Sequence, residues 1–282
     1  MIESLFSKNA VNNLRNSFKA SAAGNRWFWN SVFGFFGLTT RAAENHLEKC
    51  SDSESPSLSI LFIGNSFTYY DNMPLHFSKL AKLRFPNKEF KVYFQAGPGM
   101  FLGQHTEDER TMNTLMKSGK WDYVVLQDQS GAALRPLPTM TMKSNLKWFD
   151  KRIKQIHGKT ALFMTWSDLD QPQDQVPISK GYREAAQELK AILIPAGELF
   201  LEVSQKSPEI TLYDEDRHHP GHYGAFLVAC LAEAILLHTH DELLDIANKR
   251  KNGHIPPLQD PFEQKLLEYA DECAIREKSG TQ

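Results

Sequence analysis

The feature that most constrains this chain is the alternation of short apolar runs with longer helical patterns from residue 58 onward. The runs are apolar throughout rather than at every second residue, which is typical of strands buried on both faces of a parallel sheet. A helical pattern separates each run from the next, and this order predicts a parallel sheet with helices on both faces. The predicted strands are residues 58–63, 90–95, 121–127, 160–166 and 191–196.

Caps and helix breakers bound the predicted helices. Residues 71–74, Asp-Asn-Met-Pro, offer a cap followed by an early proline and predict a helix that ends near residue 84. Residues 106–109, Thr-Glu-Asp-Glu, match a capping box and predict a helix that ends near residue 119. Further helices are predicted over residues 139–157, 179–190 and 221–238.

Three regions are predicted along the chain. Residues 1–57 form an N-terminal appendage and linker, residues 58–240 an α/β domain, and residues 241–282 a helical tail of mixed charge. The appendage contains an aromatic segment, residues 27–38, which is too short to span a bilayer. Three interpretations of this segment stay open: a docking helix that contacts a membrane surface or a partner, an export signal, and a disordered stretch. The balance slightly favours a cytoplasmic protein over an exported one.

Charge and cysteine content exclude several classes of protein. The net charge of −2 provides no basic field, so nucleic acid is not expected as a partner. The three cysteines, Cys50, Cys230 and Cys273, are odd in number and widely spaced, which argues against a disulfide framework and against a CxxC metal site. Cys230 lies in an apolar helical stretch and is expected to be a buried free thiol.

The first predicted strand runs into Gly64-Asn65-Ser66. An open α/β sheet carries its chemistry at the carboxyl ends of strands, and a serine hydroxyl there is a candidate nucleophile if a base can reach it. Gly64 permits a tight turn, and Asn65 and Thr68 supply polar groups that can hold this turn rigid. The alternative is that Ser66 only caps the turn. The GxSxG elbow of another hydrolase class is absent from the chain.

Asp216 and His219 follow about 150 residues later in a DxxH arrangement, directly before Pro220 and a predicted helix. This spacing allows both side chains to lie on one side of a single turn. Asp216 would then accept a hydrogen bond from Nδ1–H of His219 and leave Nε2 free to take a serine proton. The alternatives are that Asp216 caps the following helix and that His219 is a surface histidine.

Two blocks of the sequence resemble the SGNH (GDSL-like) hydrolase superfamily. Residues 64–68, Gly-Asn-Ser-Phe-Thr, are similar to its first block, although that block usually reads Gly-Asp-Ser and this chain has Asn65 in the middle. Residues 216–220, Asp-Arg-His-His-Pro, match its last block, Asp-x-x-His. The resemblance covers about residues 58–240.

The resemblance implies a flavodoxin-like three-layer α/β/α sandwich with a mainly parallel five-stranded sheet. It also implies a serine esterase in which Ser66, Asp216 and His219 are catalytic and no cofactor or metal is needed. The expected substrate is a small-molecule or carbohydrate ester, for example an acetyl group on a sugar. Several side chains either line an acyl or sugar pocket or only pack near the strand ends: Tyr69, Tyr70, Met100, Phe101 and Trp166.

The resembled family holds the oxyanion with the serine N–H, a glycine N–H from a second block and an asparagine side chain from a third. Ser66 supplies the first donor. Gly99 is expected to supply the second, with Gly97 in reserve, because the proline between them has no N–H. The third block has Gln-Asp-Gln and no asparagine. A glutamine carboxamide also carries two donor hydrogens, so Gln129 is the expected third donor, ahead of Gln127.

Other functions stay open. The segment from Asp214 to His222 is dense in metal-ligand residue types, so a metal-dependent hydrolase is a rival, although a proline and a glycine interrupt the His218-x-x-x-His222 spacing. A non-catalytic ligand-binding module on the same fold is another rival because the third block lacks its asparagine. Acyl transfer to an acceptor other than water shares the acyl-enzyme with hydrolysis, and the sequence does not separate the two.

Overall fold

The computed structural model describes residues 57–117 and 120–280. Within these residues, one sheet of five parallel strands has the order β2-β1-β3-β4-β5, which is the flavodoxin-like order. The predicted α/β/α sandwich with a parallel sheet is therefore confirmed. The predictions for the aromatic segment and for Cys50 lie outside the described residues. The strands are β1 Ser57–Gly64, β2 Glu89–Ala96, β3 Tyr123–Leu126, β4 Lys159–Phe163 and β5 Ile192–Ile194.

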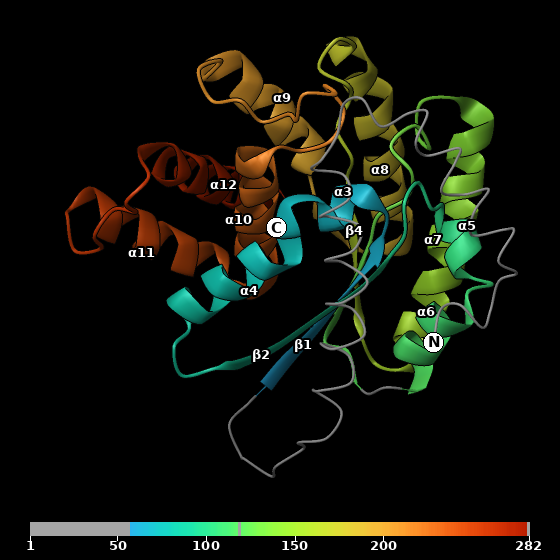
Figure 1. Cartoon of the computed structure of the whole chain (residues 1–282). Coiled ribbons are helices and arrows are strands. Elements are labelled where there is room, and N and C mark those ends of the chain that lie inside the picture. Colours follow the sequence, from blue (N-terminus) through green and yellow to red (C-terminus); the bar gives the residue numbers. More distant parts are fainter. Residues whose placement is uncertain (1–56, 118–119, 281–282) are drawn as a thin grey trace, which may run out of the picture. The chain divides into compact units, whose positions relative to one another are not determined.

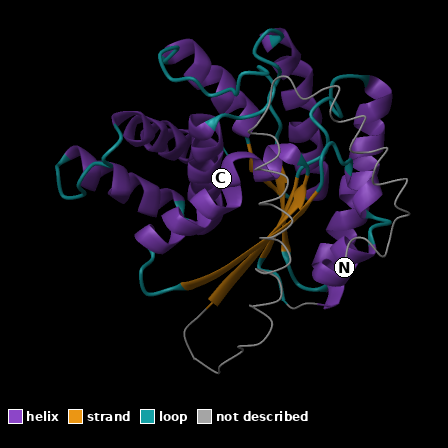
Figure 2. Ribbon diagram, in the orientation of Figure 1, coloured by secondary structure: helices purple, strands orange, loops and turns teal. Residues whose placement is uncertain are grey.

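Side chains of the sheet alternate between two separate cores. On β1, Ile60 and Phe62 face one core, and Leu61 and Ile63 face the other. Successive side chains of a strand point to opposite faces, and helices cover both faces here (Figure 2). Every residue in this stretch is therefore buried, which explains why the strands read as continuous apolar runs.

Two groups of helices cover the two faces of the sheet. Figure 1 shows α4, α10 and α12 on one side and α5, α6 and α7 on the other. Helix α10 is buried around nearly its whole circumference, as its continuous apolar sequence predicts, and Cys230 within it is a buried free thiol. No helix within the described ranges is long and apolar enough to cross a membrane.

The helices of the first core are α4 Met73–Arg84, α9 Ala196–Lys206, α10 His222–Leu237 and α12 Pro261–Ser279. Those of the second core are α5 Leu102–His105, α6 Glu109–Lys117, α7 Pro136–Gln155 and α8 Gln175–Leu189. Two further helices, α3 Ser66–Tyr69 and α11 His240–Lys251, each add one buried side chain to the first core, Phe67 and Leu243. The remaining helical elements are two 3₁₀ turns, η1 Tyr70–Asn72 and η2 Pro172–Asp174.

Several helix boundaries differ from the predictions. Helix α6 begins at Glu109 because Asp108, rather than Thr106, caps it: Asp108 Oδ2 accepts from Thr111 N at 2.8 Å. Helices α7 and α8 begin three and four residues earlier than predicted, since their prolines lie in the first turn, where a missing N–H costs little. Helix α9 is not predicted: the predicted strand 191–196 runs across Pro195, which instead ends β5 and precedes the first residue of α9, Ala196.

A buried ion cluster joins α4, α10, α11 and α12. Arg84 donates to Glu233 Oε2 at 2.8 Å and to both carboxylate oxygens of Asp271 at 3.0 Å. Arg250 also donates to Asp271, at 2.8 Å, and His238 Nε2 lies 2.9 Å from Glu233 Oε1. The side chains of Glu233 and Asp271 are 0% and 2% exposed, so their charges depend on these partners rather than on water.

Replacing Arg84 by Ala leaves Glu233 and Asp271 buried without their main cation. We expect the free energy of unfolding to fall by about 3–5 kcal/mol, measured by chemical denaturation. The matched control is Lys206→Ala, which removes a solvent-exposed partner of Glu202 and should leave the unfolding midpoint nearly unchanged. Equal effects of the two substitutions would contradict a stabilising role for the cluster.

Candidate active site

The turn after β1 holds Ser66 as the first residue of α3. Asn65 precedes this helix, and its Oδ1 accepts from Phe67 N at 3.1 Å. Asn65 Nδ2 donates to Met100 O at 3.0 Å, which ties the turn to the loop after β2. An aspartate could not make this donation, and the contact explains why an amide suits the middle position of the block. Ser66 is half-buried, and its backbone N–H has no hydrogen-bond partner within the described residues.

Gln127, directly after β3, clamps the same turn. Its Oε1 accepts from Asn65 N and from Thr68 Oγ1, both at 2.9 Å. Its Nε2 donates to Asn65 Oδ1 at 2.9 Å and to Asp128 O. The side chain is fully buried and both Nε2 hydrogens are used, so Gln127, the reserve oxyanion donor, acts as a structural bridge between the ends of β1 and β3.

Position 64 requires glycine because the side chains of Gln127 and Thr68 pack directly against its backbone. A Cβ at position 64 would overlap Gln127 Oε1 and Thr68 Oγ1. On the other side of the turn, His105 Nε2 lies 2.8 Å from Gly64 O, and burial lowers the pKa of this histidine. A neutral imidazole that donates to the Gly64 carbonyl fits these contacts.

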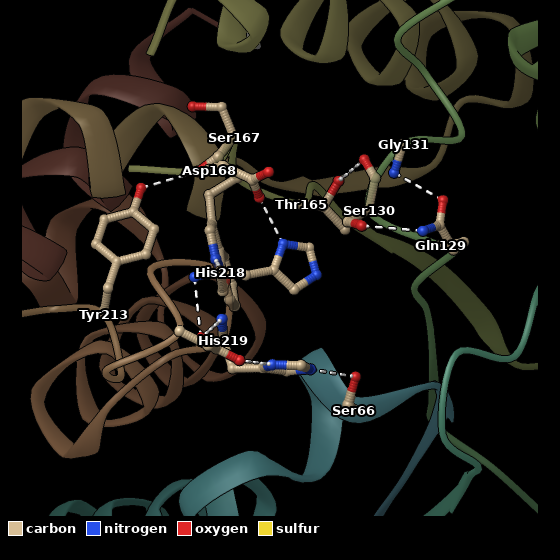
Figure 3. Close-up of polar contacts among 12 residues, drawn as sticks. Ser66, Gln129, Ser130, Gly131, Thr165, Ser167, Asp168, Tyr213, His218 and His219 are labelled. Carbon is tan, nitrogen blue, oxygen red and sulfur yellow. Dashed lines mark hydrogen bonds and ion pairs between the residues drawn. The ribbon is translucent and has the colours of Figure 1, made fainter. Parts of the chain in front are cut away.

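The loop between Tyr213 and Pro220 brings the acid and the base to Ser66. Asp216 Oδ1 accepts from the backbone N–H groups of His218 and His219 at 3.0 and 2.9 Å, which fixes the loop. Asp216 Oδ2 lies 2.5 Å from His219 Nδ1, and His219 Nε2 lies 2.9 Å from Ser66 Oγ (Figure 3). The three residues predicted from the two sequence blocks are therefore in one hydrogen-bonded chain.

The protonation states in this chain follow from the partners of Asp216. Burial acts to raise the pKa of Asp216, but hydrogen bonds from the His219 ring and from two backbone N–H groups outweigh it and hold the pKa below its usual range. An ionised carboxylate can only accept, so Nδ1 of His219 carries a hydrogen. In the neutral form of the ring, this tautomer leaves the lone pair on Nε2, the nitrogen that faces the Ser66 hydroxyl.

Aromatic side chains fix the position of the His219 ring. Tyr70 stacks on it with ring centroids 4.4 Å apart and an interplanar angle of 16°. Phe67 stacks on Trp166, whose other face stacks on Phe200. Trp166 is 1% exposed, so of the two roles suggested for it by the sequence, the structure shows packing. Phe101, by contrast, is 48% exposed.

The loop after β2 carries the predicted glycine donor. Gly99 has φ +63°, a backbone conformation that favours glycine, and its N–H has no partner within the described residues. Met100 N donates to Gly97 O at 3.2 Å, which closes the turn around Gly99. The contact from Asn65 to Met100 O places this turn beside the Ser66 turn.

Gln129 uses part of its side chain within its own turn. Its Oε1 accepts from Gly131 N at 2.8 Å, and its Nε2 donates to Ser130 Oγ at 3.1 Å (Figure 3). One of the two Nε2 hydrogens is left. Asp128 holds the loop in place, since its Oδ1 accepts from Gln129 N at 2.8 Å and from Leu102 N at 2.9 Å.

The metal-ligand residue types between Asp214 and His222 do not gather at one point. His218 Nδ1 lies 2.5 Å from Asp168 Oδ1, whereas His222 contacts Asp71 and Glu263. The proline and glycine between the two histidines prevent the helical spacing that a shared site would need.

Two residues near the site, His105 and Asp168, are missed by the sequence analysis, and two others, Tyr70 and His218, are named there without the contacts that the structure shows. Tyr70 follows the first block closely, and its nearness to Ser66 is a signal. Asp168 and His105 lie far along the chain from their partners, and no local pattern indicates those contacts.

Solved structures with similar folds include proteins named as hydrolases. A protein classed as a candidate SGNH hydrolase from Slackia heliotrinireducens is 21% identical, with a TM-score of 0.54 over 64% of this chain and 100% of that one. A DUF4886 family protein from Bacteroides uniformis ATCC 8492 is 18% identical, with a TM-score of 0.58 over 78% and 95%. An acetyl xylan esterase from Geobacillus stearothermophilus is 17% identical, with a TM-score of 0.50 over 64% and 96%.

The chain thus has the fold of the SGNH hydrolases, as the two sequence blocks predict. No protein-family model and no curated protein matches the sequence.

Replacing Gly64 by Ala should distort the Ser66 turn, because the added methyl group overlaps two buried oxygens that are already bonded. We expect the free energy of unfolding to fall by about 1–3 kcal/mol, measured by chemical denaturation. The control is Gly280→Ala, at a position where the nearest atom to a new Cβ is a backbone oxygen at 3.8 Å. A Gly64→Ala protein as stable as the control would show that the clamp does not need glycine.

Proposed function

We propose that this protein is a serine esterase that cleaves carboxylic esters through an acyl-enzyme. The observation that carries the proposal is the chain of contacts from Asp216 Oδ2 through His219 to Ser66 Oγ, with distances of 2.5 and 2.9 Å. A hydroxyl within hydrogen-bond reach of an imidazole, itself oriented by a carboxylate, is the arrangement that activates a serine nucleophile.

The proposed reaction uses His219 twice. Nε2 takes the proton of Ser66 as Oγ attacks the ester carbonyl, and then gives that proton to the leaving alkoxide as the C–O bond breaks. Water, deprotonated by His219, attacks the acyl-enzyme, and His219 returns that proton to Ser66 Oγ as the bond between Oγ and the acyl carbon breaks, which releases the acid and free Ser66. Asp216 keeps its negative charge throughout and stabilises the imidazolium that forms in each step. An alcohol in place of water would give acyl transfer with the same residues.

Three donors are proposed for the oxyanion. The N–H groups of Ser66 and Gly99 are available, since neither has a partner within the described part of the chain. The remaining Nε2 hydrogen of Gln129 is the third candidate. Donors of this kind accelerate acyl transfer because they face charge that develops only in the transition state.

A short acyl group on a carbohydrate is the proposed substrate class. An acetyl xylan esterase is among the solved structures with this fold, which supports this choice. The half-buried Tyr70 beside His219 and the exposed Phe101 near the Gly99 turn are the aromatic surfaces on which a sugar could stack. No cofactor takes part in the proposed reaction.

Replacing Ser66 by Ala should lower kcat/KM on a good acetyl ester by about a thousandfold or more, since among residues 57–117 and 120–280 Ser66 carries the only hydroxyl that is bonded to His219. A fluorophosphonate probe should label the unaltered protein at Ser66, as mapped by mass spectrometry, and should not label the variant. Ser144→Ala, on the exposed face of α7, is the control and should keep both activity and labelling. Activity of Ser66→Ala within a few-fold of the unaltered protein would overturn the nucleophile assignment.

Replacing Gln129 by Ala tests the third oxyanion donor separately from the nucleophile. If Gln129 donates in the transition state, kcat should fall by about 10²–10³-fold while KM changes little. Gln173→Ala, which removes an exposed carboxamide in η2, is the control. A loss of less than threefold would exclude Gln129 and leave the two backbone donors.

A further inference from the structure

A second group of polar side chains begins at Asp71, the residue that follows Tyr70 in the sequence. The chain turns there through Asp71 and Asn72, both in the left-handed region with φ of +45° and +55°. Two consecutive residues of this kind are uncommon outside glycine. The turn directs the Asp71 carboxylate toward His76 on α4 and His222 on α10.

The two imidazoles converge on one carboxylate oxygen. Asp71 Oδ2 lies 3.4 Å from His76 Nε2 and 2.9 Å from His222 Nδ1, and each of the three residues offers one ligand atom that lies within 4.8 Å of those of the other two. In a tetrahedral zinc site with bonds of about 2.0–2.1 Å, neighbouring ligand atoms are roughly 3.3 Å apart. The observed separations bracket that value, so small side-chain movements are enough to bring the three atoms around one ion.

The outer contacts also match those of a metal site. His222 Nε2, the nitrogen that faces away from Asp71, lies 3.1 Å from Glu263 Oε1 at the start of α12. A metal-binding histidine usually donates its second N–H to a carboxylate, which fixes the ring and makes the binding nitrogen more basic. The His76 ring packs edge-on against the His222 ring at a centroid distance of 5.4 Å and against Phe226 at 5.8 Å, which fixes its direction.

We propose that Asp71, His76 and His222 form a binding site for one divalent transition-metal ion of the Zn²⁺ type. Two imidazoles and one carboxylate suit Zn²⁺, Co²⁺ or Ni²⁺, whereas Mg²⁺ and Ca²⁺ prefer oxygen ligands alone. Three protein ligands leave a position for water. The side chains come from η1, α4 and the first turn of α10, so the ion would cross-link three elements that meet beside the Ser66 turn.

This site is separate from the proposed esterase chemistry and rests on no part of it. None of its three ligands contacts Ser66 or the His219 ring in the described structure. A competing account of the same contacts is an ion-pair network in which a protonated His222 bridges Asp71 and Glu263 without a metal. The two accounts can be separated by one measurement. A metal site binds one ion per chain and needs His76 to do so, whereas the ion-pair network binds none.

The test uses the full chain, freed of any histidine tag and of metal by chelator. Zn²⁺ is titrated in by calorimetry, and Co²⁺ by visible absorption, which reports ligand geometry independently of activity. We expect one Zn²⁺ per chain, a Co²⁺ spectrum of low-coordinate type, and a higher melting temperature in the presence of Zn²⁺. His76→Gln and Asp71→Asn should each weaken binding by at least tenfold, and Glu263→Gln by about tenfold.

Two control variants locate the ion. His254→Gln, at an exposed histidine outside the cluster, should bind Zn²⁺ like the unaltered chain. His219→Gln should also keep binding, which separates this site from the imidazole beside Ser66. Circular dichroism checks that each variant is folded. If Asp71→Asn does not fold, Co²⁺ absorption of the folded His76→Gln protein decides the test. No stoichiometric binding, or binding unaffected in His76→Gln, would overturn the proposal.

Discussion

The parallel pairing of β1 with β3 is the constraint on which the candidate site depends. Its register matches Ile63 with Leu126, so the two strands end at the same level, and Gln127 N extends the ladder by donating to Ile63 O at 2.9 Å. The strand order reverses direction at this pair, which is where open α/β sheets leave a crevice at their carboxyl ends. Gln127 then joins the two strand ends through its side-chain contacts with Asn65 and with Asp128 O. Asn65 in turn ties the Gly99 turn to the Ser66 turn through Met100 O.

Much of the fold could be predicted because burial on both sheet faces leaves a direct mark on the sequence. Ile60 through Ile63 are all apolar because alternate side chains are buried in the two cores. Helix α10 is apolar around its whole circumference because the first core surrounds it. The first residues of α6, α7 and α8 were harder to predict from the sequence. For α6, Asp108 and Thr106 are both possible caps. For α7 and α8, a proline is equally typical of the end of a loop and of the first turn of a helix.

The contacts of the candidate site could be predicted where the two residues are close in sequence, and could not be predicted where they are far apart. Asp216 and His219 are three residues apart, so their spacing alone indicates that the side chains meet. The role of Gln127 could not be read in this way. A glutamine after a strand is a plausible donor, and only the positions of Asn65 and Thr68 show that its amide hydrogens are taken. The pair of Asp168 and His218 is 50 residues apart in sequence and leaves no local pattern.

The His219 imidazole receives its carboxylate partner from within its own loop, whereas the Ser66 hydroxyl arrives from a residue 153 positions away. The basic half of the site is thus encoded in a short peptide, and the other half joins only when the sheet and α10 have come together. A partly folded chain keeps the imidazole and the hydroxyl apart. The reactivity that we propose for Ser66 would in this way arise late in folding, because an unfinished polypeptide emerging from synthesis carries an ordinary alcohol with no imidazole beside it.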